Sequence, residues 1–507
     1  QEIPIQGKTV INVIMKEKSV DLDEVVVVGY GTMKKRDITG AITSVTGEDL
    51  ESRMTTGVLE ALQGQMPGME IVAGSGQPGE SSTVRVRGTA TFSDGAASPL
   101  YIVDGVPMDD INTINPMDIA SVELLKDAAS ASIYGSRSAN GVILVTTKQG
   151  DVKKPVVNIR YLHSWSTLSH KVEMATPQLR RYFSRQRLAY SEGDGAGYVP
   201  VSFLNHDRAL LNDTTNYMFN ANNDYQDLAF KTAERNQIDA SFGGGTNNLK
   251  YHLSAGYLDE SGIIPSTGYS RISTRLNADY NVSPTLKLLS KISFTYGQKE
   301  GIDESDYLNS LIRRLPNLSL TFPDETLAGR IWGVNPLGYE YATNKKDEYR
   351  ATLFQSGEFQ LLKGLKFIAN VSASYAFDKF KRMTPSFLIN ENQTSNNANS
   401  IANMSWNWMN EDYFTYELKW KKKHTLNALL GYSMQEWHSE SDRIYGKDSP
   451  TDFIYTMNAY VANLDLNQTG TTESEHAMMS FFSRVTYNYL SRYIISANIR
   501  ADGSSRF

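Results

Sequence analysis

The sequence contains no cysteine, which excludes disulfides, iron–sulfur clusters and thiol nucleophiles. It has no apolar run long enough for a membrane-spanning helix, and no signal peptide precedes Gln1. Long basic runs are also absent: the basic cluster Lys34–Arg36 is short and the net charge is -6 at pH 7, so nothing indicates nucleic-acid binding. These absences leave a cytosolic protein, or a mature exported chain that meets membranes in another way.

Aromatic residues are plentiful despite the polar composition. The chain has 28 Tyr and 19 Phe, with a mean hydropathy of -0.38, and its 507 residues are too many for one compact core. The alternating strands of a membrane β-barrel average to a polar composition of this kind. The composition therefore favours an exported chain that crosses a membrane with strands.

The pattern of the chain changes near residue 150. Before it, a helix capped by Thr55 or Thr56 is expected to end at Gly64, and a shorter helix is expected from about Ala128 to Gly135. The expected strands are Val84–Val86, Leu100–Val103, Ser121–Leu125 and Val142–Thr146. The first part therefore reads as a small α/β domain.

After Pro155 apolar and polar residues alternate with period two. In Ile272–Tyr280 the apolar Ile272 and Leu276 share one face, and Arg275 lies on the other. The same alternation recurs in Tyr251–Tyr257, Phe367–Tyr375, Phe414–Trp420 and Tyr493–Ile499. This pattern predicts antiparallel strands with an apolar face and a polar face.

The connections between these strands alternate in length, which distinguishes a membrane barrel from a soluble sandwich. Tight turns are expected at 244–248, 283–285, 363–365, 422–424 and 491–492, and long loops at 166–233, 259–268, 297–348, 381–410 and 438–476. Short turns at one end and long loops at the other are typical of outer-membrane barrels. The sequence therefore predicts a membrane β-barrel, with the α/β domain as a plug in its lumen.

The strand count from about Val156 is about eleven, an odd number. An open strand in lipid leaves backbone groups unsatisfied at several kcal/mol each. We therefore predict half of a barrel of about 22 strands, completed by a second polypeptide or by further sequence.

Near its start the chain carries four consecutive valines, in the segment LDEVVVVGYG at Leu22–Gly31. Such β-branched residues favour extended backbone, and an extended terminal segment can be captured by the sheet edge of another protein. An ordinary buried strand of a terminal domain is the alternative.

Several segments resemble the SusC-like TonB-dependent outer-membrane transporters. They are LDEVVVVGYGTMKKRDITGAITSV at Leu22–Val45, VRVRGTA at Val84–Ala90, the whole of Pro99–Gly150, and RADGSSRF at Arg500–Phe507. In the family these are the Ton box and plug entry, a plug strand and loop, the rest of the plug, and a mid-barrel segment. The barrel between them matches mainly in pattern.

The resemblance implies active import of an oligosaccharide or a peptide across the outer membrane. The partners it implies are a SusD-like surface lipoprotein as a lid, and TonB with ExbB and ExbD as the energy source. The TonB-binding residues would be Asp23, Glu24, Val25, Val26, Val27 and Val28. The implied domains are 1–20, the end of a possible N-terminal extension; 21–31, the Ton box; 32–150, the plug; and 151–507, the first half of the barrel.

No enzyme motif withstands inspection, so no catalytic residue, cofactor or metal site is expected. Gly74, Gly76 and Gly79 fit the dinucleotide pattern, but a strand follows where a helix is required. The histidines show no metal-ligand spacing. The candidate substrate-binding residues, at the apex of the plug and in loops, are Phe92, Asp109, Asp110, Trp332 and Trp406.

Other interpretations stay open at this point. The default expectation for the tryptophans is an interfacial girdle, and for the paired aspartates a loop at the top of the plug. The same architecture would serve a siderophore or cobalamin receptor without a lid, or a surface receptor or adhesin that does not transport.

Overall fold

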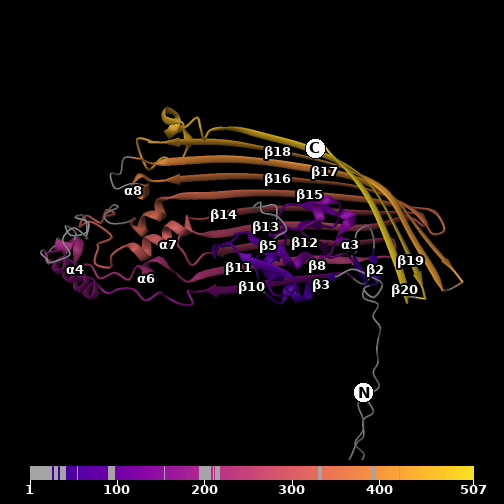
Figure 1. Cartoon of the computed structure of the whole chain (residues 1–507), viewed down its shortest axis with the longest axis horizontal. Helices are drawn as coiled ribbons and strands as arrows, with labels where there is room; N and C mark the ends of the chain where they lie inside the picture. Colours follow the sequence, from indigo (N-terminus) through magenta and orange to yellow (C-terminus); the bar gives the residue numbers. More distant parts are fainter. Residues whose placement is uncertain are drawn as a thin grey trace, which may run out of the picture.

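The computed structural model consists of an α/β domain that lies against the inner face of a long, curved antiparallel sheet (Figure 1). It describes residues 25–27, 32–34, 42–53, 55–88, 98–152, 155–192, 207–208, 211, 217–328, 334–389, 395–421, 423–490 and 492–506.

The sheet has eleven strands in sequence order, each antiparallel to the next. They are β10 (Val156–Ser166), β11 (Ala233–Gly245), β12 (Leu249–Ser261), β13 (Gly268–Ser283), β14 (Leu286–Glu300), β15 (Thr343–Leu362), β16 (Leu365–Thr384), β17 (Asn397–Trp420), β18 (His424–Lys447), β19 (Gly470–Tyr489) and β20 (Tyr493–Ser504). The predicted count is confirmed. Strands β10 and β20 form the two edges, so this chain supplies an open wall.

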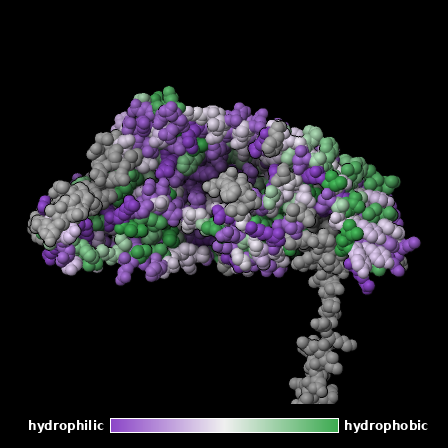
Figure 2. Space-filling view, viewed as in Figure 1, coloured by the Kyte–Doolittle hydropathy of each residue, from purple (hydrophilic) through white to green (hydrophobic). Residues whose placement is uncertain are grey.

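The two faces of the sheet differ as the alternation predicts. In β13 the outward Ile272 and Leu276 are 46% and 39% exposed, whereas the inward Arg275 and Asn277 are 7% and 2% exposed. The wall therefore presents apolar side chains outward and polar side chains toward the α/β domain, as in a barrel immersed in lipid. In the space-filling view hydrophilic residues line the hollow in the middle of this face (Figure 2).

Short turns join the strands at one end, and long connections carry helices at the other (Figure 1). These helices are α4 (Pro177–Glu192), η5 (Tyr217–Phe219), α6 (Tyr225–Ala229), α7 (Glu304–Arg313), η6 (Pro336–Tyr341), α8 (Ser386–Ile389) and η7 (Met457–Asn463). Tyr225, Tyr307, Leu311 and Tyr339 pack in one apolar cluster of these connections. Among the described residues, no helix combines the length and apolar composition needed to cross a membrane.

Several strands extend into segments that the sequence assigned to loops. Strand β15 begins at Thr343 and β17 at Asn397, while β18 continues to Lys447. These extensions pair in register with their neighbours, and those of β15 and β18 carry polar residues on both faces. Because alternation marks a strand only where one face is apolar, the pattern fades there although the strand continues.

The α/β domain contains a five-stranded sheet in the order β3-β8-β9-β6-β7 and a separate β4–β5 pair. Its elements are β3 (Ile42–Thr46), α1 (Gly47–Glu51), α2 (Val58–Leu62), β4 (Met69–Ala73), β5 (Ser82–Val86), β6 (Leu100–Val103), β7 (Val106–Met108), η2 (Pro116–Asp118), β8 (Ile119–Leu125), α3 (Ala128–Ala131), η3 (Ser132–Tyr134), η4 (Ser136–Ser138) and β9 (Val142–Thr147). Leu59, Leu62, Val122 and Ile143 are buried together in its main core. This core belongs to the domain alone.

The expected elements of this domain are present, with one correction. Helix α2 is capped by Gly57, which makes no side-chain hydrogen bond, so neither Thr55 nor Thr56 is its N-cap. The hydroxyl of Thr56 instead donates to Glu260 on the wall, at 2.7 Å. A partner about 200 residues away gives no local signal, which is why the cap was misplaced.

Part of the valine run forms β1 (Val25–Val27), which pairs with β2 (Thr32–Lys34) in a small antiparallel hairpin. Asp23, Glu24 and Val28 lie outside the described residues. The extended conformation expected for the run is therefore present in its three described valines.

Placing charge on the outer face should destabilise the wall. Leu276 lies in the middle of the outward apolar stretch of β13, so Leu276→Arg is expected to lower the unfolding free energy in bilayers by about 2–4 kcal/mol. Denaturant titration followed by tryptophan fluorescence measures the change, with Leu276→Phe as the control. Equal stability of the arginine variant would contradict an immersed outer face.

One carboxyl group is buried inside the α/β domain. Glu123 on β8 is 2% exposed, and its Oε2 has no hydrogen-bond partner in the described part of the chain. Burial raises the pKa of Glu123 to about 7. The folded domain therefore keeps this proton up to a pH of about 7, whereas the unfolded chain, with a pKa near 4.5, releases it at a lower pH.

Because this pKa is raised on folding, the stability of the domain should fall as the pH rises from about 4.5 to 7. Glu123→Gln keeps the side chain neutral, so at pH 8 it should stabilise the domain by roughly 3 kcal/mol at most. Unfolding at pH 4 and pH 8 measures this, with the exposed Glu70→Gln as control. Parallel pH profiles for the natural chain and Glu123→Gln would refute it.

Candidate functional site at the interface of the domain and the wall

Asp104 lies at the turn between β6 and β7, where the chain reads Asp-Gly. Both residues have positive φ, 52° for Asp104 and 90° for Gly105, as a tight hairpin turn requires. A Cβ on Gly105 would lie 3.1 Å from the ring of Phe354 on β15, so glycine also permits the turn to approach the wall.

The carboxylate of Asp104 is 3% exposed and lies between two cations of the wall. Lys291 Nζ on β14 is 2.5 Å from Oδ1, and Arg275 Nη1 on β13 is 3.4 Å from Oδ2. Thr147 donates its backbone N–H and its hydroxyl to the same carboxylate, at 3.1 and 2.6 Å. The turn is thus joined by ion pairs to two neighbouring wall strands.

Burial alone would raise the pKa of Asp104, but Lys291 and Arg275 outweigh it and hold the pKa below its usual value of 3.8. The carboxylate is therefore ionised at neutral pH. Asp118 adds a second carboxylate 3.8 Å from Nε of Arg275. We call Asp104, Asp118, Arg275 and Lys291 the latch.

A second set of contacts holds the loop that follows β7. Arg271 Nη1 on β13 donates to the carbonyl oxygens of Asn112 and Ile114, at 3.0 and 3.4 Å. Asn115 Nδ2 donates to Asp239 Oδ1 on β11, at 2.6 Å. This loop is therefore fixed to the wall by buried polar bonds rather than by apolar packing.

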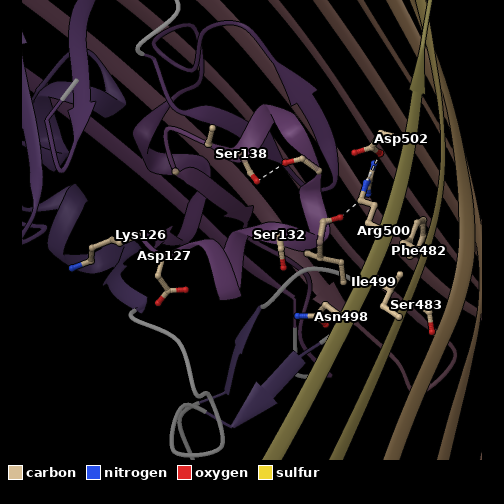
Figure 3. A pocket seen from close by; sticks show the side chains of 14 residues that line it. Lys126, Asp127, Ser132, Ser138, Phe482, Ser483, Asn498, Ile499, Arg500 and Asp502 are labelled. Carbon is tan, nitrogen blue, oxygen red and sulfur yellow. Dashed lines mark hydrogen bonds and ion pairs between the residues drawn. The ribbon is translucent and has the colours of Figure 1, made fainter. Parts of the chain in front are cut away.

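A third set joins the domain to the last two strands around a cavity of about 420 Å³ (Figure 3). Arg500 on β20 donates to the carbonyl oxygen of Ile133 at 2.6 Å and to Asp502 at 2.7 Å. Gly135 has φ +76°, and a Cβ there would lie 2.6 Å from Asp502 Oδ2. The glycine thus leaves room for the Arg500–Asp502 pair.

The predicted substrate-binding aspartates differ in their surroundings. Asp109 is exposed. Asp110 is partly buried and accepts a hydrogen bond from the backbone N–H of Asn112 at 2.8 Å. Burial, with Glu348 adding repulsion, raises the pKa of Asp110 despite the opposing effect of Arg350. Phe92 and Trp332 lie outside the described residues.

The remaining candidate in the described part of the chain, Trp406, lies on the outer face of β17. Met409 and Tyr413 of the same strand line a cavity beside the domain. Trp406 lies an odd number of residues from both, so its side chain points to the opposite face, away from the domain. Its ring stacks on His438, with ring centres 5.2 Å apart. On the same face His438 lies beside Glu473 and Glu475. The positions of these three residues in the sequence do not reveal that they come together. This position suits an interfacial aromatic residue rather than a ligand contact in the lumen.

Sequence reasoning missed the inward tryptophan. Trp437 has the parity of Gln435, stacks on His476 at 4.5 Å between ring centres, and lies 4.7 Å from the guanidinium carbon of Arg137 of the domain. The available signal was the alternation of inward and outward positions along β18. The sequence does not show this alternation in so polar a stretch. The described wall therefore carries an aromatic pair that faces the lumen and meets a cation of the domain.

Comparison with known proteins fits this geometry. Residues 34–142 match the family model described as the TonB-dependent Receptor Plug Domain. The solved structure of the RagAB peptide importer in its open-open state superposes with a TM-score of 0.80 at 24% identity, covering 96% of this chain and 57% of that one. The ferripyoverdine receptor of Pseudomonas aeruginosa gives 0.57 at 11% identity, covering 95% and 54%. The chain therefore has the fold of plugged outer-membrane β-barrels, and it supplies a plug domain and eleven strands of the wall.

The curated relatives narrow this class. The chain is 35% identical to TonB-dependent receptor P39 of Formosa agariphila over all of its own length and 47% of the relative. It is 26% identical to TonB-dependent receptor SusC of Bacteroides thetaiotaomicron, over all of this chain and 51% of that protein. The resemblance to the SusC-like TonB-dependent transporters is confirmed. The chain spans about half the length of these relatives.

Removing the charge of Asp104 should loosen the latch. Asp104→Asn leaves Lys291 buried without its counterion and Arg275 with Asp118 alone, which is expected to cost about 3–5 kcal/mol. Trypsin cleavage of the α/β domain should accelerate, and the exposed Asp109→Asn serves as control. The lowered pKa means that the latch contributes above the usual Asp pKa and is lost as the pH falls through the lowered value. The asparagine variant should lack this acid-dependent loss; equal cleavage rates at neutral pH would contradict the latch.

Proposed function

We propose that this chain is part of a TonB-dependent transporter that imports an oligosaccharide or a peptide nutrient across the outer membrane. The observation that carries the proposal is the position of the α/β domain: it lies within the curve of the wall and is held there by polar bonds. A domain placed in this way obstructs passage and must move before a nutrient too large for porins can cross. Movement of the domain requires energy. Neither the α/β domain nor the wall has a nucleotide-binding motif that would supply it.

The work would come from TonB, with ExbB and ExbD, acting on the Ton box at Asp23–Val28. TonB would add a strand to the extended valines, since strand addition needs only a reachable backbone. The β1–β2 hairpin pairs three residues on each strand. So small a hairpin is only marginally stable in water, which supports its exchange for a new partner strand.

The outer end of the wall supports a lid. Long connections with their own apolar cluster gather there, and a SusD-like lipoprotein would close over them. Solved structures with this fold include a peptide importer and a peptide transporter, which supports a peptide as one class of cargo. The fold is closer to these than to the ferripyoverdine receptor, with TM-scores of 0.77–0.80 against 0.57. This favours lidded import over a siderophore or cobalamin receptor.

The two sheet edges support completion of the barrel. Edge strands β10 and β20 would leave backbone groups unpaired in lipid, at several kcal/mol each. A second polypeptide or further sequence would supply the strands that pair with them. Co-purification in detergent identifies that half and the lid together, and the absence of a large lipoprotein would favour the receptor without a lid.

Deleting Asp23–Val28 tests the energy coupling. The variant should lose binding to the purified periplasmic domain of TonB, while deletion of the equally long Asn12–Glu17 should retain it. In cells, nutrient binding should persist and growth on that nutrient should fail. Unchanged growth with the Ton box deleted would overturn the import proposal and favour a surface receptor or adhesin.

A further inference from the structure

Three side chains that can bind a metal ion meet on the outer face of the wall, away from the α/β domain. His438 on β18 lies directly opposite Glu475 on β19, and Glu473 is the next outward residue of β19. Both glutamates share the outward face of β19 with the exposed Met479. One ring nitrogen of the histidine and one carboxylate oxygen of each glutamate all lie within 4.8 Å of one another. We call His438, Glu473 and Glu475 the outer triad.

The outer triad stands in a group of carboxylates that lacks a strong cationic partner. Glu440 on β18 lies directly opposite Glu473. In the described part of the chain, no lysine or arginine forms an ion pair with Glu440, Glu473 or Glu475. Like charges that face each other across a strand pair destabilise the pair. This stretch of the β18–β19 pair therefore has an excess of negative charge that a bound cation would remove.

The donor atoms of the outer triad have the spacing of a small tetrahedral ion. Nδ1 of His438 lies 2.9 Å from Oε1 of Glu475 and 3.9 Å from Oε1 of Glu473. Zinc binds nitrogen and oxygen donors at about 2.0–2.2 Å, so two donors of a tetrahedral site are about 3.4 Å apart. The two observed distances bracket this value. Coordination therefore needs only small rotations of the two glutamate side chains, which are 63% and 60% exposed.

The histidine is held in position without a metal. Its side chain is only 11% exposed, and the ring of Trp406 stacks on the imidazole with 13° between the ring planes. Trp406 lies directly opposite His438 on β17. Three adjacent strands thus build the site, with a supporting ring from β17, a nitrogen from β18 and oxygens from β19. A ligand whose rotamer is fixed by packing loses little freedom when it binds a metal.

The chemistry of the donors selects the kind of ion. Mg²⁺ and Ca²⁺ take oxygen ligands, whereas imidazole suits Zn²⁺ and its neighbours among the transition metals. A zinc site with three protein ligands keeps its fourth position for water. The exposure of Glu473 and Glu475 leaves that position open to solvent. The donor set therefore fits Zn²⁺ better than the alkaline-earth ions.

We propose that the outer triad is a binding site for Zn²⁺ that joins β18 to β19 on the outer face of the wall. Among the described residues, β20 pairs with β19 only from Met478 onward, so β18 is the one strand beside Glu473 and Glu475. The ion replaces repulsion between like charges with a cross-link at this end of the strand pair. The proposal does not rest on the import function, because the site faces away from the lumen.

Zinc titration of the whole chain tests the site. The chain is purified in detergent with a tag that contains no histidine, stripped with a chelator, and titrated with zinc chloride by isothermal titration calorimetry. His438→Gln and Glu475→Gln each remove one ligand. Each should weaken zinc binding at least about tenfold, because losing a residue that merely supports a ligand already costs about 10- to 100-fold.

Glu440→Gln is the matched control, since it removes a neighbouring charge but no ligand. It should weaken zinc binding less than about fivefold, because exposed charges interact weakly. Other zinc sites in the chain are common to all four proteins, so the differences report on the outer triad. Cobalt binding reads the geometry separately: the natural chain and Glu440→Gln should show the strong visible absorption of tetrahedral Co²⁺, and His438→Gln should not.

Three results would overturn the site. One is zinc affinity that neither ligand substitution changes. Another is an equal loss in Glu440→Gln and Glu475→Gln, which would show attraction of cations by charge alone. The third is displacement of Zn²⁺ by an equal concentration of Ca²⁺. If His438→Gln fails to fold, the exposed Glu475→Gln decides, since its thermal unfolding without metal should match that of the natural chain.

Discussion

A carboxylate buried between two cations holds the α/β domain against the wall. Asp104 reaches the wall because an Asp-Gly turn brings the backbone close to Phe354, and it stays ionised because Lys291 and Arg275 are there to meet it. Neither side tolerates the loss of the other, since each would leave a charge buried without a partner. The position of the domain, and with it the shape of the cavities on either side, follows from this contact.

The interface is polar almost wherever it is described, and this suits a part that must separate. The apolar core of the domain lies within the domain itself, and most apolar side chains of the wall face outward, although Phe354 and Phe482 are buried on the inner face. Between the two lie ion pairs, backbone carbonyls and amide groups such as those of Asn112, Asn115 and Ile133. Water can replace such bonds, so separation exposes little apolar surface and leaves the domain folded.

The wall was predictable where lipid imposes a pattern. Period-two alternation found β13 and its neighbours because one face must be apolar, and the α/β elements followed from turn and propensity signals. The ends of β15 and β18 were missed because a strand with polar residues on both faces has no alternation. The site was hidden for another reason: Asp104 and Lys291 are 187 residues apart, and no local pattern connects them.

The choice among the tryptophans illustrates the same limit. Trp406 and Trp437 are equivalent in composition, and only the register of β17 with β18 places one outside and the other inside. A shift of one residue would exchange them. Recognition of the family supplied the fold, but the assignment of individual side chains required the paired strands.

The polar upper ends of the strands have a consequence for how cargo arrives. Strands β17 and β18 each have 24 residues, which at about 3.3 Å per residue is on the order of 80 Å of extended chain. Tilted by about 40°, such a strand rises roughly 60 Å, more than twice the apolar band of about 25 Å that an outer membrane requires. The wall therefore extends well above the lipid. A partner that docks on the ends of these strands meets its ligand far from the membrane surface.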